Sequence, residues 1–194
     1  MEYQSYVAIA CGRWFLLSLR QVLVNGKTAE VGTRWYAKPM EQEKKFAVIQ
    51  VPDLNWPPAL EIPSKRFRLF VAADITEVST QTVSDFALAA LNQGMVYFCS
   101  WGPGCERFHD IVDEVVVEDD IGEQKFARPN SSDVIMTTWH ANDNLEEAID
   151  FFATFAVPTD GFAPDSDFRL VVCVANQQWA TQADKFLQSA KFFV

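Results

Sequence analysis

The sequence predicts an α/β protein with a three-layer, Rossmann-like (flavodoxin-like) arrangement around a mostly parallel sheet, preceded by an irregular N-terminal extension. From residue 67 onward, short apolar runs rich in β-branched and aromatic residues alternate with stretches of helical spacing. These runs are hydrophobic on both faces, as strands are when helices cover both sides of a parallel sheet. With 194 residues, 49% of them hydrophobic, the chain is long enough for one domain with a substantial core.

The predicted elements of the core follow one another in strand-helix order. Strands are expected where β-rich runs occur, at 67–74, 95–100, 134–140 and 168–176, with a further short strand at 115–117. Helices are expected where apolar residues recur every three or four positions, at 79–94, 105–114, 144–156 and 177–190. Crossover helices between parallel strands place helices on both faces of the sheet.

The N-terminal third is less regular, and we divide the single structural domain into an extension at 1–66 and a core at 67–194. The runs at 6–10 and 45–51 are expected to be strands, and the run at 14–24 fits either a helix or a strand. Asn25 and Gly26 form the "NG" signal of a hairpin turn. The segment 52–66 contains four prolines, which predicts an ordered connection wrapped on the core.

The net charge of −10 is unevenly distributed along the chain. Residues 1–70 hold ten Lys/Arg and six Asp/Glu, whereas residues 71–194 hold six and twenty. The acidic part excludes a nucleic-acid surface there, because phosphate binding needs concentrated basic side chains. From Glu106 to Glu123 there are eight carboxylates and one arginine without a calcium-loop pattern, which favours a solvated face or a surface that contacts a basic protein partner.

The cysteines and the apolar runs indicate the cellular compartment in which the protein is expected. The four cysteines contain no CxxC pair, and two of them lie in apolar runs, so neither a zinc knuckle nor a disulfide framework is expected. The longest apolar runs are far shorter than the roughly 20 residues of a membrane helix. The N-terminus lacks the basic region of a secretory signal. These features predict a cytoplasmic protein with no membrane contact.

The fold predicts where a site lies. In a parallel α/β sheet, ligands collect beyond the carboxyl ends of the strands, where helix N-termini present free N–H groups. We therefore predict that a ligand is bound there by Asp74, Trp101, Gly102, Glu106, Arg107, Asp110, Trp139 and Asn176. Trp101 and Trp139 end neighbouring predicted strands, so they can form an aromatic wall for a planar ligand or belong to the core.

One cysteine and both histidines form the candidate catalytic set. Cys105 opens a predicted helix, where the helix dipole lowers the pKa of a thiol and favours the nucleophilic thiolate. His109 lies four residues later on the same helix face, and His140 ends the next predicted strand. Glu106 or Asp110 can orient an imidazole. The alternative is that Cys105 is a buried structural cysteine, which is the commoner role.

The sequence offers weaker candidates for a metal site and for a nucleotide site. A metal set would combine residues from three separate strand ends, namely His109, Asp110, His140, Asp143 and Asp74. No short ligand motif joins them, which favours surface carboxylates over a metal site. No cofactor is indicated, because both GxGxxG and GxxxxGK[ST] are missing. The "GPG" turn at 102–104 can receive an anion, with Arg107 as its counter-charge, or can be a tight turn that opens a helix.

Two segments resemble an uncharacterised bacterial family that is classed as a domain of unknown function. Its pattern W-G-x-x-C-E-R-x-H-D is matched within 101–110, and its pattern T-T-W-H followed by L-x-E-A is matched by 137–140 and 145–148. The resemblance covers about 67–190. It implies no activity, because the family has none assigned, and it therefore supports the choice of segments alone.

Two function hypotheses follow. The first is a binding module, for a small polar ligand at the carboxyl edge of the sheet or for a protein partner through the acidic face. The second is an enzyme, either a Cys/His-based hydrolase or transferase or a metal-dependent one, that uses Cys105, His109 and His140 while Arg107 holds an anionic substrate group. Binding is preferred because no catalytic motif is complete, and the fold alone does not decide between them.

Overall fold

A seven-stranded sheet with the order β2-β1-β5-β9-β6-β7-β8 forms the centre of the computed structural model. The structure describes residues 6–10, 13–17, 22–24, 27–29, 45–121, 126, 128–130 and 132–189. The strands of this sheet are β1 (Tyr6–Ala10), β2 (Arg13–Leu17), β5 (Phe46–Val51), β6 (Phe67–Ala72), β7 (Met95–Trp101), β8 (Met136–His140) and β9 (Phe168–Val174). The five strands from β5 to β8 along this order are mutually parallel, and β1 and β2 add an antiparallel pair.

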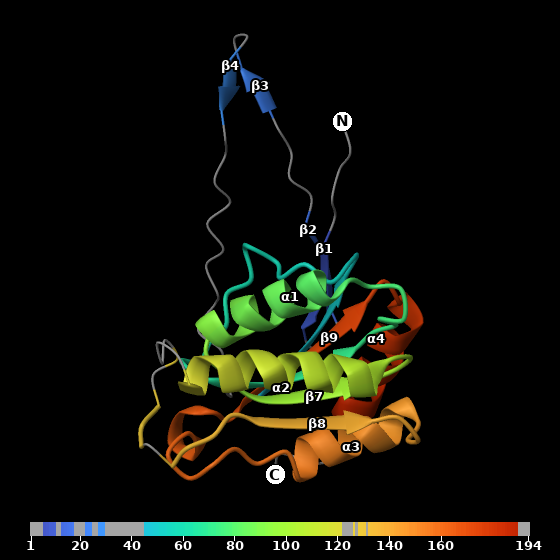
Figure 1. Cartoon of the computed structure of the whole chain (residues 1–194). Helices are drawn as coiled ribbons and strands as arrows, with labels where there is room; N and C mark the ends of the chain where they lie inside the picture. The colour runs from blue at the N-terminus through green and yellow to red at the C-terminus, as the bar shows by residue number, and fades with distance from the viewer. Residues whose placement is uncertain are drawn as a thin grey trace.

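Helices cover both faces of the sheet (Figure 1). One face carries α1 (Thr80–Asn92) and α2 (Cys105–Ile121), whose apolar side chains join one buried cluster. The other face carries α3 (Leu145–Thr154) and α4 (Gln177–Ser189), which belong to a second cluster. The predicted three-layer α/β class is therefore confirmed. None of the helices among the described residues is long and apolar enough to cross a membrane.

The strands are buried on both faces, as their continuous apolar runs predict. Every residue of β6 is buried, including Arg68. The guanidinium of Arg68 donates from Nε to the Ser166 carbonyl (3.0 Å) and from Nη1 to the Ala156 carbonyl (3.1 Å). Burial lowers the pKa of Arg68, while the nearby carboxylate of Asp167 partly opposes that effect. A buried charge is thus retained because its donors are paired.

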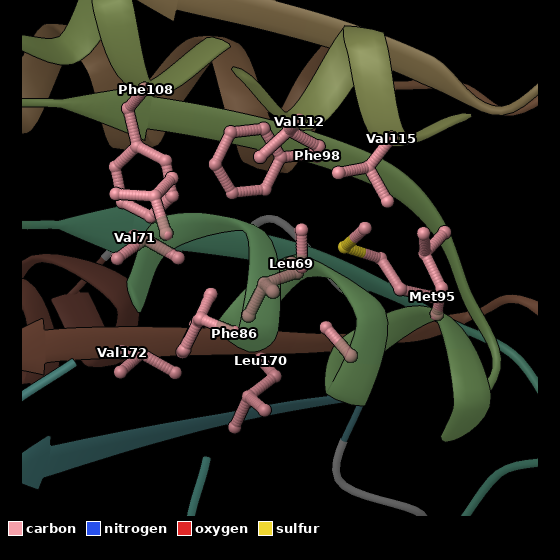
Figure 2. Close-up of a cluster of buried hydrophobic side chains, with 14 of the residues drawn as sticks. Leu69, Val71, Phe86, Met95, Phe98, Phe108, Val112, Val115, Leu170 and Val172 are labelled. Carbon is pink, nitrogen blue, oxygen red and sulfur yellow. The ribbon is translucent and has the colours of Figure 1, made fainter. Parts of the chain in front are cut away.

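Aromatic packing fixes α2 against the sheet (Figure 2). The rings of Phe98 on β7 and Phe108 on α2 lie 5.0 Å apart between centroids, and Phe86 of α1 lies 6.0 Å from Phe108. All three side chains are buried. Tilted and edge-to-face contacts of this kind stabilise more than their buried area alone. The position of α2 relative to β7 and α1 is therefore strongly specified.

Helix α2 is longer than predicted, and the expected short strand at 115–117 is wrong. The helix continues from Cys105 to Ile121. Val115 and Val116 are buried one turn beyond Ile111 and Val112, so the four residues form one apolar stripe on the helix. Tertiary burial of this stripe outweighs the β preference of three consecutive valines.

The N-terminal part contributes to the same sheet. The runs at 6–10 and 45–51 are β1 and β5, as predicted, and β5 pairs in parallel with β9. The described residues of the run at 14–24 are strands, since 14–17 belong to β2 and 22–24 form β3 (Val22–Val24). β3 pairs antiparallel with β4 (Lys27–Ala29), and the predicted turn at Asn25 and Gly26 lies outside the described residues. In the segment 52–66, Leu54, Trp56, Leu60 and Ile62 pack against the cluster of α1 and α2.

Two features of the strand order concern β9 and β8. The last strand, β9, is inserted between β5 and β6, although those two come first among the parallel strands. In the part of the chain that the structure describes, β8 is the end of the sheet and has β7 as its neighbour. Figure 1 shows β8 between α2 and α3.

Candidate functional site

The carboxyl ends of β7 and β8 lie side by side, with Ser100 opposite Trp139 and Trp101 opposite His140. Successive side chains of a strand point to opposite faces. Trp101 packs with the cluster of α3 and α4, where its ring lies 5.2 Å from that of Trp179. Trp139 lies on the α2 face and is 44% exposed. The two tryptophans therefore do not form one aromatic wall, and Trp101 is the one that joins the core.

His140 fixes the loop between β8 and α3. Its Nδ1 lies 2.5 Å from Oδ2 of Asp143, and its ring centroid lies 4.6 Å from that of Phe151. Its side chain is 9% exposed, and within the described residues its buried Nε2 has no hydrogen-bond partner. Asn144, which directly follows Asp143, caps α3 through a reciprocal capping box with Glu147. His140 thus belongs to a local network that starts α3.

His109 lies on the opposite face of the sheet and joins α2 to β8. Its Nε2 is 3.0 Å from the hydroxyl of Thr137, which donates to the carboxylate of Asp113 (3.2 Å). Its Nδ1 lies 3.1 Å from Asp110, and its ring centroid lies 4.5 Å from that of Trp139. Because Trp139 and His140 are consecutive in β8, their side chains point to opposite faces. The sheet therefore separates the two imidazoles, which were predicted to form one catalytic set with Cys105.

The thiol of Cys105 lies beside the backbone of His140. It is buried, and burial raises its pKa from the ordinary value, although the backbone N–H groups of His140, Glu106 and Cys105 itself lower it in part. The lowered pKa expected at a helix N-terminus is therefore wrong for this thiol. The free-energy cost of removing the thiolate from water is larger than the stabilisation of the thiolate by the helix dipole and these hydrogen bonds.

The described cysteines are expected to be poorly reactive in the folded protein. Burial raises the pKa of Cys99 and of Cys173 to about 12, and it also raises the pKa of Cys105. In variants that each retain one of these thiols, reaction with a chromogenic aromatic disulfide at neutral pH should be about 100-fold slower than in denaturant. Rapid reaction of Cys105 in the native protein would contradict this prediction and revive a nucleophilic role.

Several candidate ligand residues use their polar atoms to hold the strand-end loops. The carboxylate of Asp74 accepts from the hydroxyl (2.6 Å) and the N–H (3.0 Å) of Thr76, and these bonds lower its pKa. Asn176 accepts from the N–H of Trp179 (3.0 Å) at the start of α4. Asp74 and Asn176 therefore perform turn and cap functions.

Arg107, Trp101 and Gly102 have similar local roles. Arg107 donates to the Ile75 carbonyl and to the Thr80 hydroxyl, each at 3.1 Å, and so connects α2 to the start of α1. The indole N–H of Trp101 donates to the carbonyl of Asp143 (2.8 Å). Gly102 has a φ of 109° and lies against the backbone of the loop after β6. The "GPG" segment is thus a tight turn packed against that loop.

The structure places a different set of residues together at the outer side of β8. Val134 and Met136 are exposed at its start, and Phe155 and Val157, which follow α3, are 64% and 58% exposed. Glu106, Asp110 and Asp113 lie on the stripe of α2 that carries His109. We call this surface the β8 face, made up of the exposed residues Val134, Met136, Trp139, Phe155 and Val157 with the carboxylates Glu106, Asp110 and Asp113.

Most of the β8 face was missed from the sequence. A signal for it exists in the composition of β8, "MTTWH", which is more polar than the fully buried β6, "FRLFVA". Central strands of a parallel sheet are apolar on both faces, so two threonines and a histidine mark a strand at the end of the sheet. The spacing of His109 and Asp113, four residues apart, likewise predicts that they share a helix face.

The side chains that were predicted as possible metal ligands lie in separate places. Among the residues that the structure describes, no three His, Cys, Asp or Glu side chains are grouped so that they could hold a metal ion. His109 and Asp110 form one pair on the α2 face, and His140 and Asp143 form another at the start of α3. Asp74 is engaged with Thr76 in the loop after β6.

Comparison with known proteins places the chain in a family. Searches of the curated proteins and of the solved structures each returned no match. A family model described as a domain of unknown function (DUF7684) matches residues 46–190, a range that begins at β5 and ends directly after α4. Because this range spans well over half of the 194 residues, the chain belongs to the DUF7684 family.

Proposed function

We propose that the protein is a protein-binding module that holds a basic partner on the β8 face. The observation that carries this proposal is a strand at the end of the sheet whose apolar side chains are exposed next to an acidic helix. Exposed sheet edges are usually protected by charge, bulges or a covering element because they pair readily with other chains. An exposed Trp139 on such a strand supports a contact role, since tryptophan often anchors protein interfaces.

The negative charge of the β8 face supports a positively charged partner. Glu106 and Asp110 are exposed on α2, and the half-buried Asp113 lies on the same stripe. Residues 71–194 carry six Lys/Arg against twenty Asp/Glu, so the surroundings of the face reinforce its negative potential. A positively charged partner gains both association rate and specificity from such a surface.

A small-ligand site or an enzyme receives less support. One carboxylate oxygen of Asp74, the amide oxygen of Asn176 and both terminal nitrogens of Arg107 take part in hydrogen bonds within the fold. The two imidazoles lie on opposite faces of the sheet, and the Cys105 thiol is buried with a raised pKa. A protein partner that covers an exposed face makes no demand on these residues.

Affinity capture with matched variants tests the proposal. The bait is used as the wild type, as the double variant Glu106→Gln/Asp110→Asn, and as the control Glu61→Gln/Glu77→Gln, which removes two exposed carboxylates elsewhere. A true partner should be retained by the wild type and the control and weakened about tenfold by the first double variant, with binding that falls as salt rises.

The captured protein must then be purified and titrated against the same three baits. Direct binding with the expected order of affinities supports the proposal. Equal affinity for all three baits would contradict it, because the partner would then use another surface of the molecule.

A further inference from the structure

We infer that the partner adds an extended strand to the edge of β8 that no described strand occupies, with basic side chains on its α2 side and apolar side chains on its α3 side. This inference rests on the proposed function and deepens it by specifying the conformation and the side-chain pattern of the bound segment. Addition of a strand to a sheet edge is a general mode of peptide recognition, in which the backbone supplies affinity and alternate side chains supply specificity.

The backbone of β8 supports this mode. The carbonyl of Thr138 points toward β7, since it accepts a hydrogen bond from the hydroxyl of Ser100 (3.4 Å). The N–H of His140, two residues later, donates to the thiol of Cys105, which follows the turn after β7. Alternate residues of an edge strand turn their backbone groups outward. The N–H and C=O groups of Thr137 and Trp139 are therefore directed away from β7, and an added strand can pair with them.

The two sides of β8 differ in chemistry. On the α2 side, the indole of Trp139 is exposed, and Glu106 and Asp110 lie on the adjoining stripe of the helix. On the α3 side, Met136 is exposed, and the chain after α3 adds Phe155. Because a crossover helix runs antiparallel to its strands, Phe155 lies about 6 Å beyond Phe151, toward the start of β8. Near the start of β8, an added strand thus has the acidic stripe of α2 on one side and the apolar Met136 and Phe155 on the other, whereas the exposed Glu146 and Glu147 in the first turn of α3 lie near the end of β8.

Alternation of side chains converts this difference into a sequence pattern. Residues i, i+2 and i+4 of the added strand point to the α2 side, and the residues between them point to the α3 side. Lysine or arginine at the first set meets the carboxylates of α2, while valine or isoleucine at the second set covers the exposed Met136 and Phe155. The favoured partner segment therefore alternates basic and apolar residues.

A second copy of this chain fits the edge less well. Antiparallel pairing of two β8 strands requires a two-fold axis perpendicular to the sheet, which places α2 of one copy beside α2 of the other. Glu106 and Asp110 would then approach the same carboxylates of the second copy. Like charges held close together weaken an interface, so the acidic stripe favours a basic partner over self-association.

Two labelled peptides of about nine residues and identical composition test the inference. In one peptide lysine and valine alternate, and in the other all lysines precede all valines. We expect the alternating peptide to bind at least about tenfold more tightly by fluorescence anisotropy, because it alone can direct the two residue types to opposite sides. The double variant Glu106→Lys/Asp110→Lys should weaken this binding by about tenfold or more, whereas the control Glu61→Lys/Glu77→Lys, of equal net charge, should not.

Amide hydrogen exchange measured by NMR gives an independent readout. At saturating alternating peptide, exchange of the outward amides of Thr137 and Trp139 should slow by about tenfold or more, whereas the amide of Thr138, which faces β7, should change little. Unchanged exchange at Thr137 and Trp139 in a complex that does form would overturn strand addition.

The remaining outcomes separate the two proposals. Equal binding of both peptides, lost in Glu106→Lys/Asp110→Lys, would overturn strand addition while leaving an acidic protein-binding face in place. No binding of the alternating peptide would also overturn strand addition, and the capture experiment then decides the proposed function by itself. A dimer in sedimentation experiments that Met136→Lys dissociates would show that a second copy occupies the edge, which overturns the basic partner.

Discussion

Replacement of Phe98 with alanine is expected to lower the free energy of unfolding by about 3–5 kcal/mol. The ring is fully buried at the centre of the cluster shared by β7, α1 and α2, and it contacts the ring of Phe108 at 5.0 Å (Figure 2). Its removal loses the transfer free energy of the ring and leaves a cavity that the rigid surroundings fill in part. Urea or guanidinium unfolding followed by circular dichroism measures the change.

The matched control is Phe155→Ala, the same substitution at an exposed site. Phe155 is 64% exposed, so its replacement should change the free energy of unfolding by no more than about 0.5 kcal/mol. The same variant should weaken binding of the alternating peptide, because Phe155 belongs to the apolar side of the β8 face. Equal destabilisation by the two substitutions would show that the cluster around Phe98 is not the core described above.

Replacement of Gly102 with alanine is expected to destabilise the protein by about 2–4 kcal/mol. Its φ of 109° lies in a region that side-chain-bearing residues rarely adopt. A Cβ at this position would also lie 2.4 Å from the carbonyl oxygen of Ala73, which belongs to the backbone and cannot rotate away. The unfolding free energy of the purified variant, measured in denaturant, tests this value.

The variant Gly104→Ala separates the cost of the positive φ from the cost of the contact between an added Cβ and the backbone. Gly104 also has a positive φ, of 80°, but the atom nearest to an added Cβ is Cγ1 of the Ile75 side chain, at 3.0 Å. A side chain can shift, so this substitution should cost about 1–2 kcal/mol, mainly from the backbone conformation. If Gly104→Ala is as costly as Gly102→Ala, the contact between Gly102 and Ala73 has no separate importance.

The sequence predicts the layered α/β architecture well, because the physics that sets it is local. Runs such as 67–72 and 168–174 are apolar on both faces and bounded by polar turns, which is sufficient to identify strands of a covered parallel sheet. The end of α2 was missed for a related reason. The local β preference of Val115 to Val117 competes with a helical stripe whose burial becomes visible when the helix is packed on the sheet.

The candidate site was predicted less well, because it depends on information that periodicity does not contain. Chain position places Cys105, His109 and His140 near one edge, but it does not show which side of the sheet α2 covers. The alternation of Trp139 and His140 within β8 does predict that their side chains diverge, and this signal was available. The position of β8 at the end of the sheet follows from strand order, which arises from long-range packing.

The insertion of β9 between β5 and β6 has a consequence for synthesis on the ribosome. Residues 46–51 and 67–72 leave the ribosome early, yet each pairs with residues 168–174 and not with the other. Until that late strand emerges, a nascent chain can join β6, β7 and β8 while one side of β6 and one side of β5 stay open. Non-local pairing of this kind slows folding and exposes aggregation-prone edges, so chaperone protection is most needed between the emergence of residues 67–72 and that of residues 168–174.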